Sequence, residues 1–230
     1  MVITILGWGL LTVAQTLSGD SDLRALDLRC EGQVSPLGAG EAPRLSWRAE
    51  SNRRADSVSA WQVQVASEGG LLGDGVSDLW DSGRRNASRT PHVIYGGEAL
   101  QAGAVCHWRV RLWDADGRVS PWSATAIWEV APLTMEDWGG AVWIDDGRAL
   151  PKDDASFYEE DPAPRFCGQF DVAKPVAKAR LHVAGLGLFR AQINGAPIAP
   201  DEFGPPWTVF DKRVLFSTYD VTEFLSLIHI

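Results

Sequence analysis

Between residues 26 and 130, apolar and polar residues alternate in short segments, and this pattern constrains the fold more than any other feature. In 61–65, Trp and Val alternate with Gln, and in 106–113, Cys, Trp, Val and Leu alternate with His, Arg and Trp. A period of two places successive side chains on opposite faces of a β-strand, and no stretch here keeps the 3.6-residue period of a helix. The segments therefore predict strands with one face toward a core and one toward water.

Turn-forming residues separate these segments. Gly, Asp and Ser cluster at 81–83, 95–97 and 114–117, where they favour or tolerate turn geometry. About a hundred residues with strands at this spacing predict a β-sandwich. A glycine turn followed by Ser-Pro-Trp-Ser at 120–123 is similar to the late strands of a fibronectin type III domain.

A second β-rich region follows a connector that contains Pro and paired acidic residues, with one short strand predicted at 141–144. Further strands are predicted, at 166–172, 179–184, 188–194 and 214–219. Asn194-Gly195 favours a two-residue hairpin, because a type I′ turn needs positive φ at both positions. Asp220 followed by Glu223 resembles the cap of a short helical turn.

The predicted fold class is all-β, with a fibronectin type III-like sandwich followed by an incomplete second β-sandwich of jelly-roll type. We expect an unassigned extension over 1–24 and the first sandwich over 25–132. A connector over 133–165 and a partial second sandwich over 166–230 complete the predicted organisation.

Composition excludes several classes of function. A net charge of −9 argues against nucleic acid as a partner, since phosphate binding needs clustered Lys and Arg. The three cysteines lie far apart without a CxxC pair, so we expect buried thiols and neither a zinc site nor a disulfide framework.

No segment after the N-terminus approaches the roughly 20 apolar residues of a membrane span, so no membrane partner is expected. Residues 1–17 resemble the apolar part of a signal peptide, but no Lys or Arg precedes them and Gly and Gln interrupt them. We favour a cytoplasmic protein, with secretion as the alternative if this segment acts as a signal.

Three acidic clusters, 145–146, 153–154 and 159–161, could be read as acid/base pairs or as a calcium site. They lie among Gly, Pro and Lys, without EF-hand spacing or an apolar flank to raise a pKa, so solvated loops are favoured. The four histidines lack metal-ligand spacing, and no nucleophile motif is present. We predict no catalytic residue, no metal site and no cofactor.

Seven motifs, in their order along the chain, resemble the N-terminal part of bacterial α-L-rhamnosidases. They are PLGAGEAPRLSWRAES, WQVQVAS, LWDSG, YGGEALQAGAVCHWRVRLWDADGRVSPWS, MEDWGGAVWI, AGLGLFRAQINGAPI and FDKRVLFSTYDVTEFL. The resemblance covers roughly residues 26–225. It departs from the family before residue 23 and over the apolar tail 226–230, which we interpret as a truncation or a foreign reading frame.

The resemblance implies two β-sandwiches followed by a large helical toroid that carries catalysis and lies outside this chain. Enzymes of this family hydrolyse terminal α-L-rhamnose with inversion, which requires two carboxyl groups about 6.5 to 9.5 Å apart. Both are expected in the toroid. The implied function is therefore a non-catalytic N-terminal part that braces the toroid and is inactive alone. Its implied partners are this catalytic domain and, in the full-length enzyme, rhamnose-containing glycosides.

Two alternatives remain open: a carbohydrate-binding β-sandwich module and a structural fibronectin-like protein. For the first, Trp207, Phe210 and Trp113 could stack on sugar faces, and Asn194 and Asp211 could bind hydroxyl groups. Against it, the loop that holds the first two residues follows two prolines and could pack beneath a neighbouring domain.

Overall fold

The computed structural model describes residues 21–87, 92–148, 153, 162–199 and 203–225, and the chain divides into two compact units. The first unit comprises the described residues up to Ser35 together with Ala42–Ala99 and Val105–Ile127. The second comprises Pro36–Glu41, Leu100–Ala104 and the described residues from Trp128 onward. The predicted signal segment 1–17 and the acidic cluster 159–161 lie outside the described residues.

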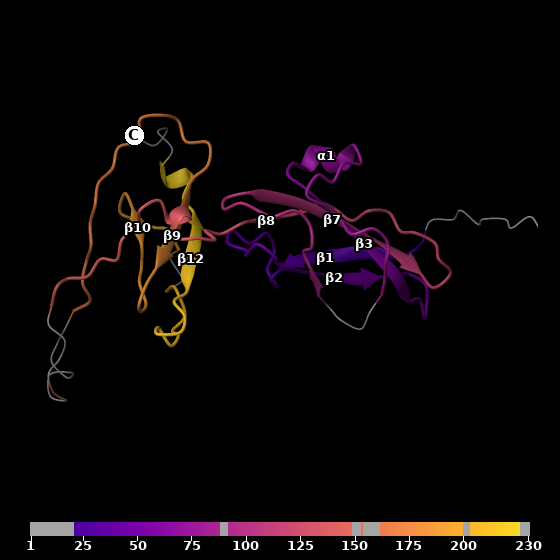
Figure 1. Cartoon of the computed structure of the whole chain (residues 1–230), viewed down its shortest axis with the longest axis horizontal. Helices are drawn as coiled ribbons and strands as arrows, with labels where there is room; N and C mark the ends of the chain where they lie inside the picture. Colours follow the sequence, from indigo (N-terminus) through magenta and orange to yellow (C-terminus); the bar gives the residue numbers. More distant parts are fainter. Residues whose placement is uncertain (1–20, 88–91, 149–152, 154–161, 200–202, 226–230) are drawn as a thin grey trace, which may run out of the picture. The chain divides into compact units, whose positions relative to one another are not determined.

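Two sheets form the framework of the first unit (Figure 1), one with the strand order β1-β2-β6 and one with the order β4-β3-β7-β8. The strands are β1 (Arg24–Cys30), β2 (Arg44–Glu50), β3 (Val58–Ala66), β4 (Trp80–Asp81), β5 (Arg85–Asn86), β6 (Val93–Ile94), β7 (Val105–Asp114) and β8 (Ala126–Glu129), whose last two residues belong to the second unit. The short strand β5 also pairs with β3, and a five-residue helix, α1 (Gly69–Gly73), follows β3. The all-β prediction is confirmed.

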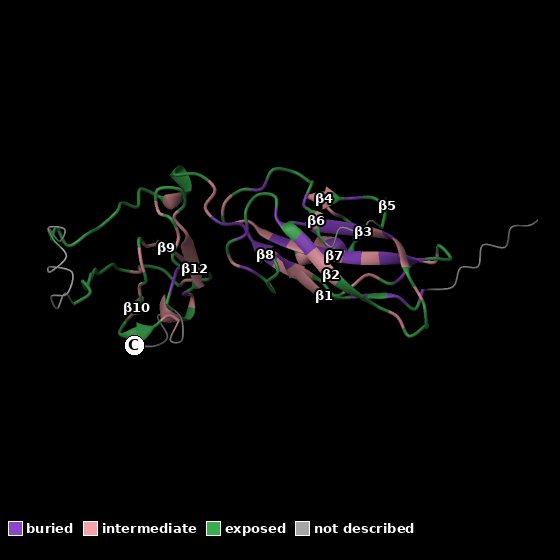
Figure 2. Ribbon diagram, turned by 90° about the horizontal axis from the view of Figure 1, so that it is seen from below, coloured by how far each residue is buried: buried purple, intermediate pink, exposed green. Residues whose placement is uncertain are grey.

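The core of the first unit lies on the inner faces of β3 and β7, which pair antiparallel from Val58 opposite Asp114 to Ala66 opposite His107. The apolar residues predicted to face inward on these strands are buried, except Trp61, which is partly exposed, and Figure 2 shows the buried positions gathered there. They include Val63, Val65, Cys106, Trp108, Val110 and Leu112. The alternating pattern therefore predicted the core face correctly.

The outer face of these strands differs from the prediction, because Gln62 and Gln64 are each only 7% exposed. Arg109 donates two hydrogen bonds to Oε1 of Gln64, at 3.1 and 2.8 Å, and Arg111 donates one to Oε1 of Gln62 at 2.9 Å. Both guanidinium groups lie over the Trp122 ring, 4.3 and 4.6 Å from its centroid. Alternation in the sequence distinguishes the two faces of a strand. It does not show that the side chains of neighbouring residues cover the polar face and exclude water from it.

The second unit contains two small antiparallel sheets, β9 with β12 and β10 with β11. Its elements are a 3-10 helix over Glu136–Trp138, β9 (Arg180–Ala184), β10 (Gln192–Ile193), β11 (Ala196–Pro197), β12 (Phe216–Asp220) and a 3-10 helix over Glu223–Leu225. Asn194 and Gly195 adopt φ values of 50° and 79° between β10 and β11, which confirms the predicted hairpin. Thr222 N donates to Asp220 Oδ1 at 3.0 Å before the last helix, as the capping pattern predicted.

Two strand predictions in this unit were wrong. Residues 141–144 and 166–172 pair with no other strand in the described part of the chain. Residues 141–144 are a short apolar run and residues 166–172 alternate as strands do, but a strand also needs a partner for its backbone hydrogen bonds. The expectation of three buried thiols was likewise wrong for Cys167, which is exposed in the second of these segments.

Large apolar side chains are exposed along much of the second unit, where green and pink dominate Figure 2. They are Met135, Val142, Trp143, Ile144, Phe166, Phe170, Leu186, Leu188, Phe203, Trp207 and Val209. We call this set the apolar surface of the second unit. Between Leu133 and Leu225, Val221 is the one described hydrophobic residue that is buried. No helix among the described residues has the length and apolar content needed to cross a membrane.

Candidate functional site

A buried carboxylate organises the charged groups of the second unit. Glu129, with a side chain 7% exposed, accepts hydrogen bonds from Nε and Nη2 of Arg180 at 3.0 and 2.5 Å. Nζ of Lys178 lies 2.9 Å from the same carboxylate. Burial alone would raise the pKa of Glu129, but the hydrogen bonds from Arg180 and Lys178 outweigh burial and lower it. The carboxylate is therefore ionised near neutral pH.

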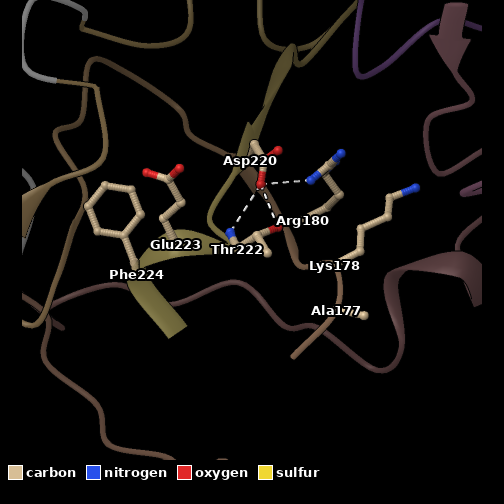
Figure 3. Close-up of a pocket in the computed structure, with 7 residues that line it drawn as sticks. All are labelled: Ala177, Lys178, Arg180, Asp220, Thr222, Glu223 and Phe224. Carbon is tan, nitrogen blue, oxygen red and sulfur yellow. Dashed lines mark hydrogen bonds and ion pairs between the residues drawn. The ribbon is translucent and has the colours of Figure 1, made fainter. Parts of the chain in front are cut away.

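A hollow of about 640 Å³ opens beside this cluster (Figure 3). It is lined by Ala177, Lys178, Arg180, Asp220, Thr222, Glu223 and Phe224. Asp220 accepts hydrogen bonds from the backbone N and the Oγ1 of Thr222, at 3.0 and 2.6 Å, and pairs with Arg180 at 2.8 Å. The bonds from Thr222 are the main reason why the pKa of Asp220 is lowered. This carboxyl group is thus poorly suited to donate a proton.

Sequence reasoning did not find this cluster, because its members form no local motif. Glu129 and Arg180 are 51 positions apart, and each lies in a strand whose sequence has no feature that marks a charged site. Only the pairing of β9 with β12 and the path of the chain at Glu129 bring the charges together.

His182 occupies an aromatic environment in the same sheet. Its ring lies edge-on to Trp138 and Phe216, at centroid distances of 6.3 and 6.4 Å, and its Nδ1 is 2.9 Å from Oγ1 of Thr218. Burial lowers the pKa of His182, so the imidazole is neutral near pH 7. The described residues contain no group of three or more His, Cys, Asp or Glu side chains placed to hold a metal ion.

Two of the predicted carbohydrate-binding residues lie together. The rings of Trp207 and Phe210 are 4.9 Å apart and inclined by 49°, and Trp207 is 72% exposed. Gly187 lies beneath the indole, where an added Cβ would be 3.9 Å from the ring. The arrangement presents an open aromatic surface on a turn of the second unit.

The other predicted residues do not join this pair through any hydrogen bond or ring contact among the described residues. Asn194 is in the hairpin turn and donates to the backbone oxygen of Phe224 at 3.1 Å. Asp211 is exposed in the turn after Phe210. Trp113 belongs to the first unit, is 9% exposed, and has guanidinium groups 5.0 and 5.1 Å from its ring centroid.

The acidic loop residues are also exposed where the structure describes them. Asp145 accepts a hydrogen bond from the backbone N of Gly147 at 2.8 Å, and Asp146 forms an ion pair with Arg148. Local turns and a neighbouring cation thus satisfy these carboxylates.

Comparison with known proteins identifies both halves of the chain. Residues 25–134 match a family described as the Rha78A-like, N-terminal immunoglobulin domain, and residues 174–227 match the alpha-L-rhamnosidase N-terminal domain. An alpha-L-rhamnosidase of Alteromonas sp. (strain LOR) is 37% identical over 204 residues, which is 85% of this chain and 21% of that protein. An alpha-L-rhamnosidase of Formosa agariphila is 33% identical over 202 residues, which is again 85% of this chain and 21% of that protein.

Solved structures agree with these matches. The alpha-L-rhamnosidase from Dictyoglumus thermophilum superposes with a TM-score of 0.74 at 31% identity, over 87% of this chain and 23% of that one. The alpha-L-rhamnosidase from Aspergillus terreus superposes with a TM-score of 0.69 at 30% identity, over 89% of this chain and 22% of that one. The chain spans about a fifth of the length of the curated relatives that it matches. Through these two N-terminal domains, in this order, the chain belongs to the α-L-rhamnosidase family.

Proposed function

We propose that this chain is the non-catalytic N-terminal part of an α-L-rhamnosidase, and that it braces a catalytic domain which hydrolyses terminal α-L-rhamnose from glycosides. The proposal rests on one observation: both domains match the N-terminal domains of this family, in the same order. The match spans only about a fifth of the length of the relatives. The family names and the structural superpositions support the activity of the complete enzyme, with rhamnose-containing glycosides as its substrates.

The ionisation of the described carboxyl groups supports a non-catalytic role. Inverting glycosidases need one carboxylic acid whose raised pKa keeps it protonated at working pH. Where the pKa of a described Asp or Glu departs from its ordinary value, it is lowered, as in Glu31, Asp78, Asp81, Glu129, Asp137, Asp146 and Asp220. None of these groups has the character of a general acid.

The apolar surface of the second unit supports the bracing role. Val142 is 79% exposed, Trp143 63% and Phe170 68%, in segments whose sequences are typical of paired strands. Exposed apolar area of this extent is characteristic of surfaces that other polypeptide covers. In the proposed enzyme, the remaining chain covers these side chains and completes the hydrogen bonding of the two segments.

The test starts from the coding DNA beyond the codon for Ile230. The complete reading frame, residues 1–230 alone, and the frame without residues 1–230 are expressed and assayed with p-nitrophenyl α-L-rhamnopyranoside. We expect the complete protein to release nitrophenol, residues 1–230 to release none, and the frame without them to lose soluble active enzyme. A stop codon directly after Ile230, or turnover by residues 1–230 alone, would refute the proposal.

A second candidate function is carbohydrate binding by the exposed pair of Trp207 and Phe210. An aromatic ring that is open on one face offers apolar contact to a sugar ring. Titration of the chain with L-rhamnose, followed by tryptophan fluorescence, tests this function. We expect saturable binding that Trp207→Ala abolishes and that Trp143→Ala, an exposed Trp in the connector, leaves intact. Equal behaviour of the two variants would exclude this site.

A further inference from the structure

Two of the three cysteines are buried in the first unit, one in each sheet. Cys30 is the last residue of β1 and is 1% exposed, whereas Cys106 is the second residue of β7 and is fully buried. Both are free cysteines in this structure. Neither thiol has a part in the proposed function, so any chemistry of this pair is independent of it.

The path of the two strands brings these cysteines toward each other. β1 and β7 are in contact across the sandwich, and near its other end Oγ of Ser21 donates to Oδ2 of Asp114 at 3.1 Å. Nine residues forward from Ser21 is Cys30, and eight residues back from Asp114 is Cys106.

The difference of one residue is absorbed by an irregularity in β1. The pairing of β1 with β2 shifts between Leu26 and Arg29, where Asp27 has a φ of 50°. A bulge adds one residue to a strand without lengthening it correspondingly. Each cysteine therefore lies about 27 Å along its strand from the hydrogen bond between Ser21 and Asp114, so the two cysteines are at the same level of the sandwich.

The electrostatics of the two thiols agree with this placement. Burial is the main reason why the pKa of each thiol is raised to about 12, and for Cys30 the neighbouring Glu31 and Cys106 contribute to this rise. Thiols with such values are protonated and unreactive while the strands are closed. Each cysteine is at or next to a strand end, where local opening costs less than unfolding of the core.

We propose that Cys30 and Cys106 form a disulfide site that cross-links the two sheets of the immunoglobulin-like domain under oxidising conditions. The oxidant is a small-molecule disulfide such as glutathione disulfide. The thiolate of one cysteine, formed on local opening, attacks a sulfur of glutathione disulfide and releases one reduced glutathione. The second cysteine then attacks the mixed disulfide and releases the other, so that the two protons and two electrons of the protein thiols pass to glutathione.

The cross-link closes the long loop between β1 and β7. A closed loop reduces the conformational entropy of the unfolded chain, which stabilises the folded state if the native geometry accepts the bond. Oxidation should therefore raise the unfolding temperature of the first unit by at least about 5 °C.

The experiment uses the full chain with Cys167→Ser, which removes the exposed third thiol. The protein is incubated with glutathione disulfide under native conditions, and intact mass, linked peptides and thermal unfolding are measured. We expect a loss of about 2 Da, one linked peptide pair that contains Cys30 and Cys106, and a higher unfolding temperature that dithiothreitol reverses. Cys30→Ala in the same background is the matched control, and it should show no such loss of mass.

Other outcomes would overturn the proposal. One is that the two thiols stay reduced in the native protein and are linked only in urea. Another is that the native protein is linked but unfolds at a lower temperature, because the bond then strains the sandwich and does not belong to its native geometry.

Discussion

The guanidinium of Arg180 donates two hydrogen bonds to the carboxylate of Glu129, at 3.0 and 2.5 Å, across 51 positions of sequence. The side chains are 16% and 7% exposed, so water compensates neither charge fully. In such a pair the loss of one partner costs more than the intact pair contributes, because the remaining charge stays buried without its counterpart. This relationship makes Arg180 the most informative position for mutation in the second unit.

Arg180→Leu should reduce the free energy of unfolding by about 2 to 3 kcal/mol, since Lys178 compensates the Glu129 charge only in part. Urea unfolding at pH 7, followed by tryptophan fluorescence, measures the change. Arg48→Leu is the control, because Arg48 forms an ion pair in which both side chains are more than half exposed, and it should cost below about 0.5 kcal/mol. Equal losses in the two variants would show that burial of the pair is unimportant.

The contribution of Glu129 should depend on pH. Its folded-state pKa lies below its ordinary value of 4.5, so its ionised form stabilises the fold above that pH. This stability is lost as the pH falls through the lowered pKa. The difference in unfolding temperature between the unmodified chain and Glu129→Gln should be largest near neutral pH and shrink below pH 4.5. Thermal melts from neutral to acidic pH measure it, and a difference that grows in acid would contradict the assignment.

Gly97 should tolerate no side chain. A Cβ at this position would lie 2.2 Å from the backbone oxygen of Leu79 and 2.5 Å from Cβ of Trp80, and neither atom can move freely. Gly97→Ala should therefore destabilise the first unit by about 3 kcal/mol. Gly73→Ala, at a position with open space around it, should be neutral or slightly stabilising. Chemical denaturation of both variants makes the comparison, and a stable Gly97→Ala protein would show that this turn can shift.

Gln64 should stabilise the outer face of the first unit through its hydrogen bonds. Replacement by Leu tests this, because Leu has nearly the same volume and forms no hydrogen bond. Its side chain accepts from Arg109 and donates to Asp81 at 2.9 Å, so Gln64→Leu leaves both charged groups short of a partner. We expect a loss of about 2 kcal/mol in the free energy of unfolding. Gln101→Leu, at an exposed position, serves as the control in the same denaturation experiment. If both variants unfold alike, the network contributes packing and not hydrogen bonding.

The apolar surface of the second unit should limit solubility more than stability. Phe170 is 68% exposed, so Phe170→Ser should leave the unfolding temperature unchanged while it lowers the light scattering of concentrated samples. Val34→Ser, at a residue that is 66% exposed in the first unit, should change neither property. A marked fall in the unfolding temperature of Phe170→Ser would mean that this side chain is packed in solution.

Local patterns in the sequence predicted much of the fold, because their physical causes are local. Alternation on β3 and β7 identified the core face, since side chains on a strand necessarily change sides at each residue. Asn194-Gly195 identified the hairpin, since few residue pairs accept positive φ twice in succession. The seven family-like motifs identified the domain order for a related reason, because each encodes a strand or turn at a set place in the chain.

The sequence by itself thus determined the all-β class, the core face of the first sandwich, the hairpin and the family. Tertiary structure alone decided which side chains far apart in sequence meet. It paired Arg180 with Glu129, placed two guanidinium groups over the Trp113 ring and brought Trp207 into contact with Phe210. It also left residues 166–172 without a strand partner among the described residues. The physical reason is that alternation and turn propensity act between neighbours in the chain, whereas burial, ion pairing and strand pairing depend on partners that only the folded path of the chain supplies.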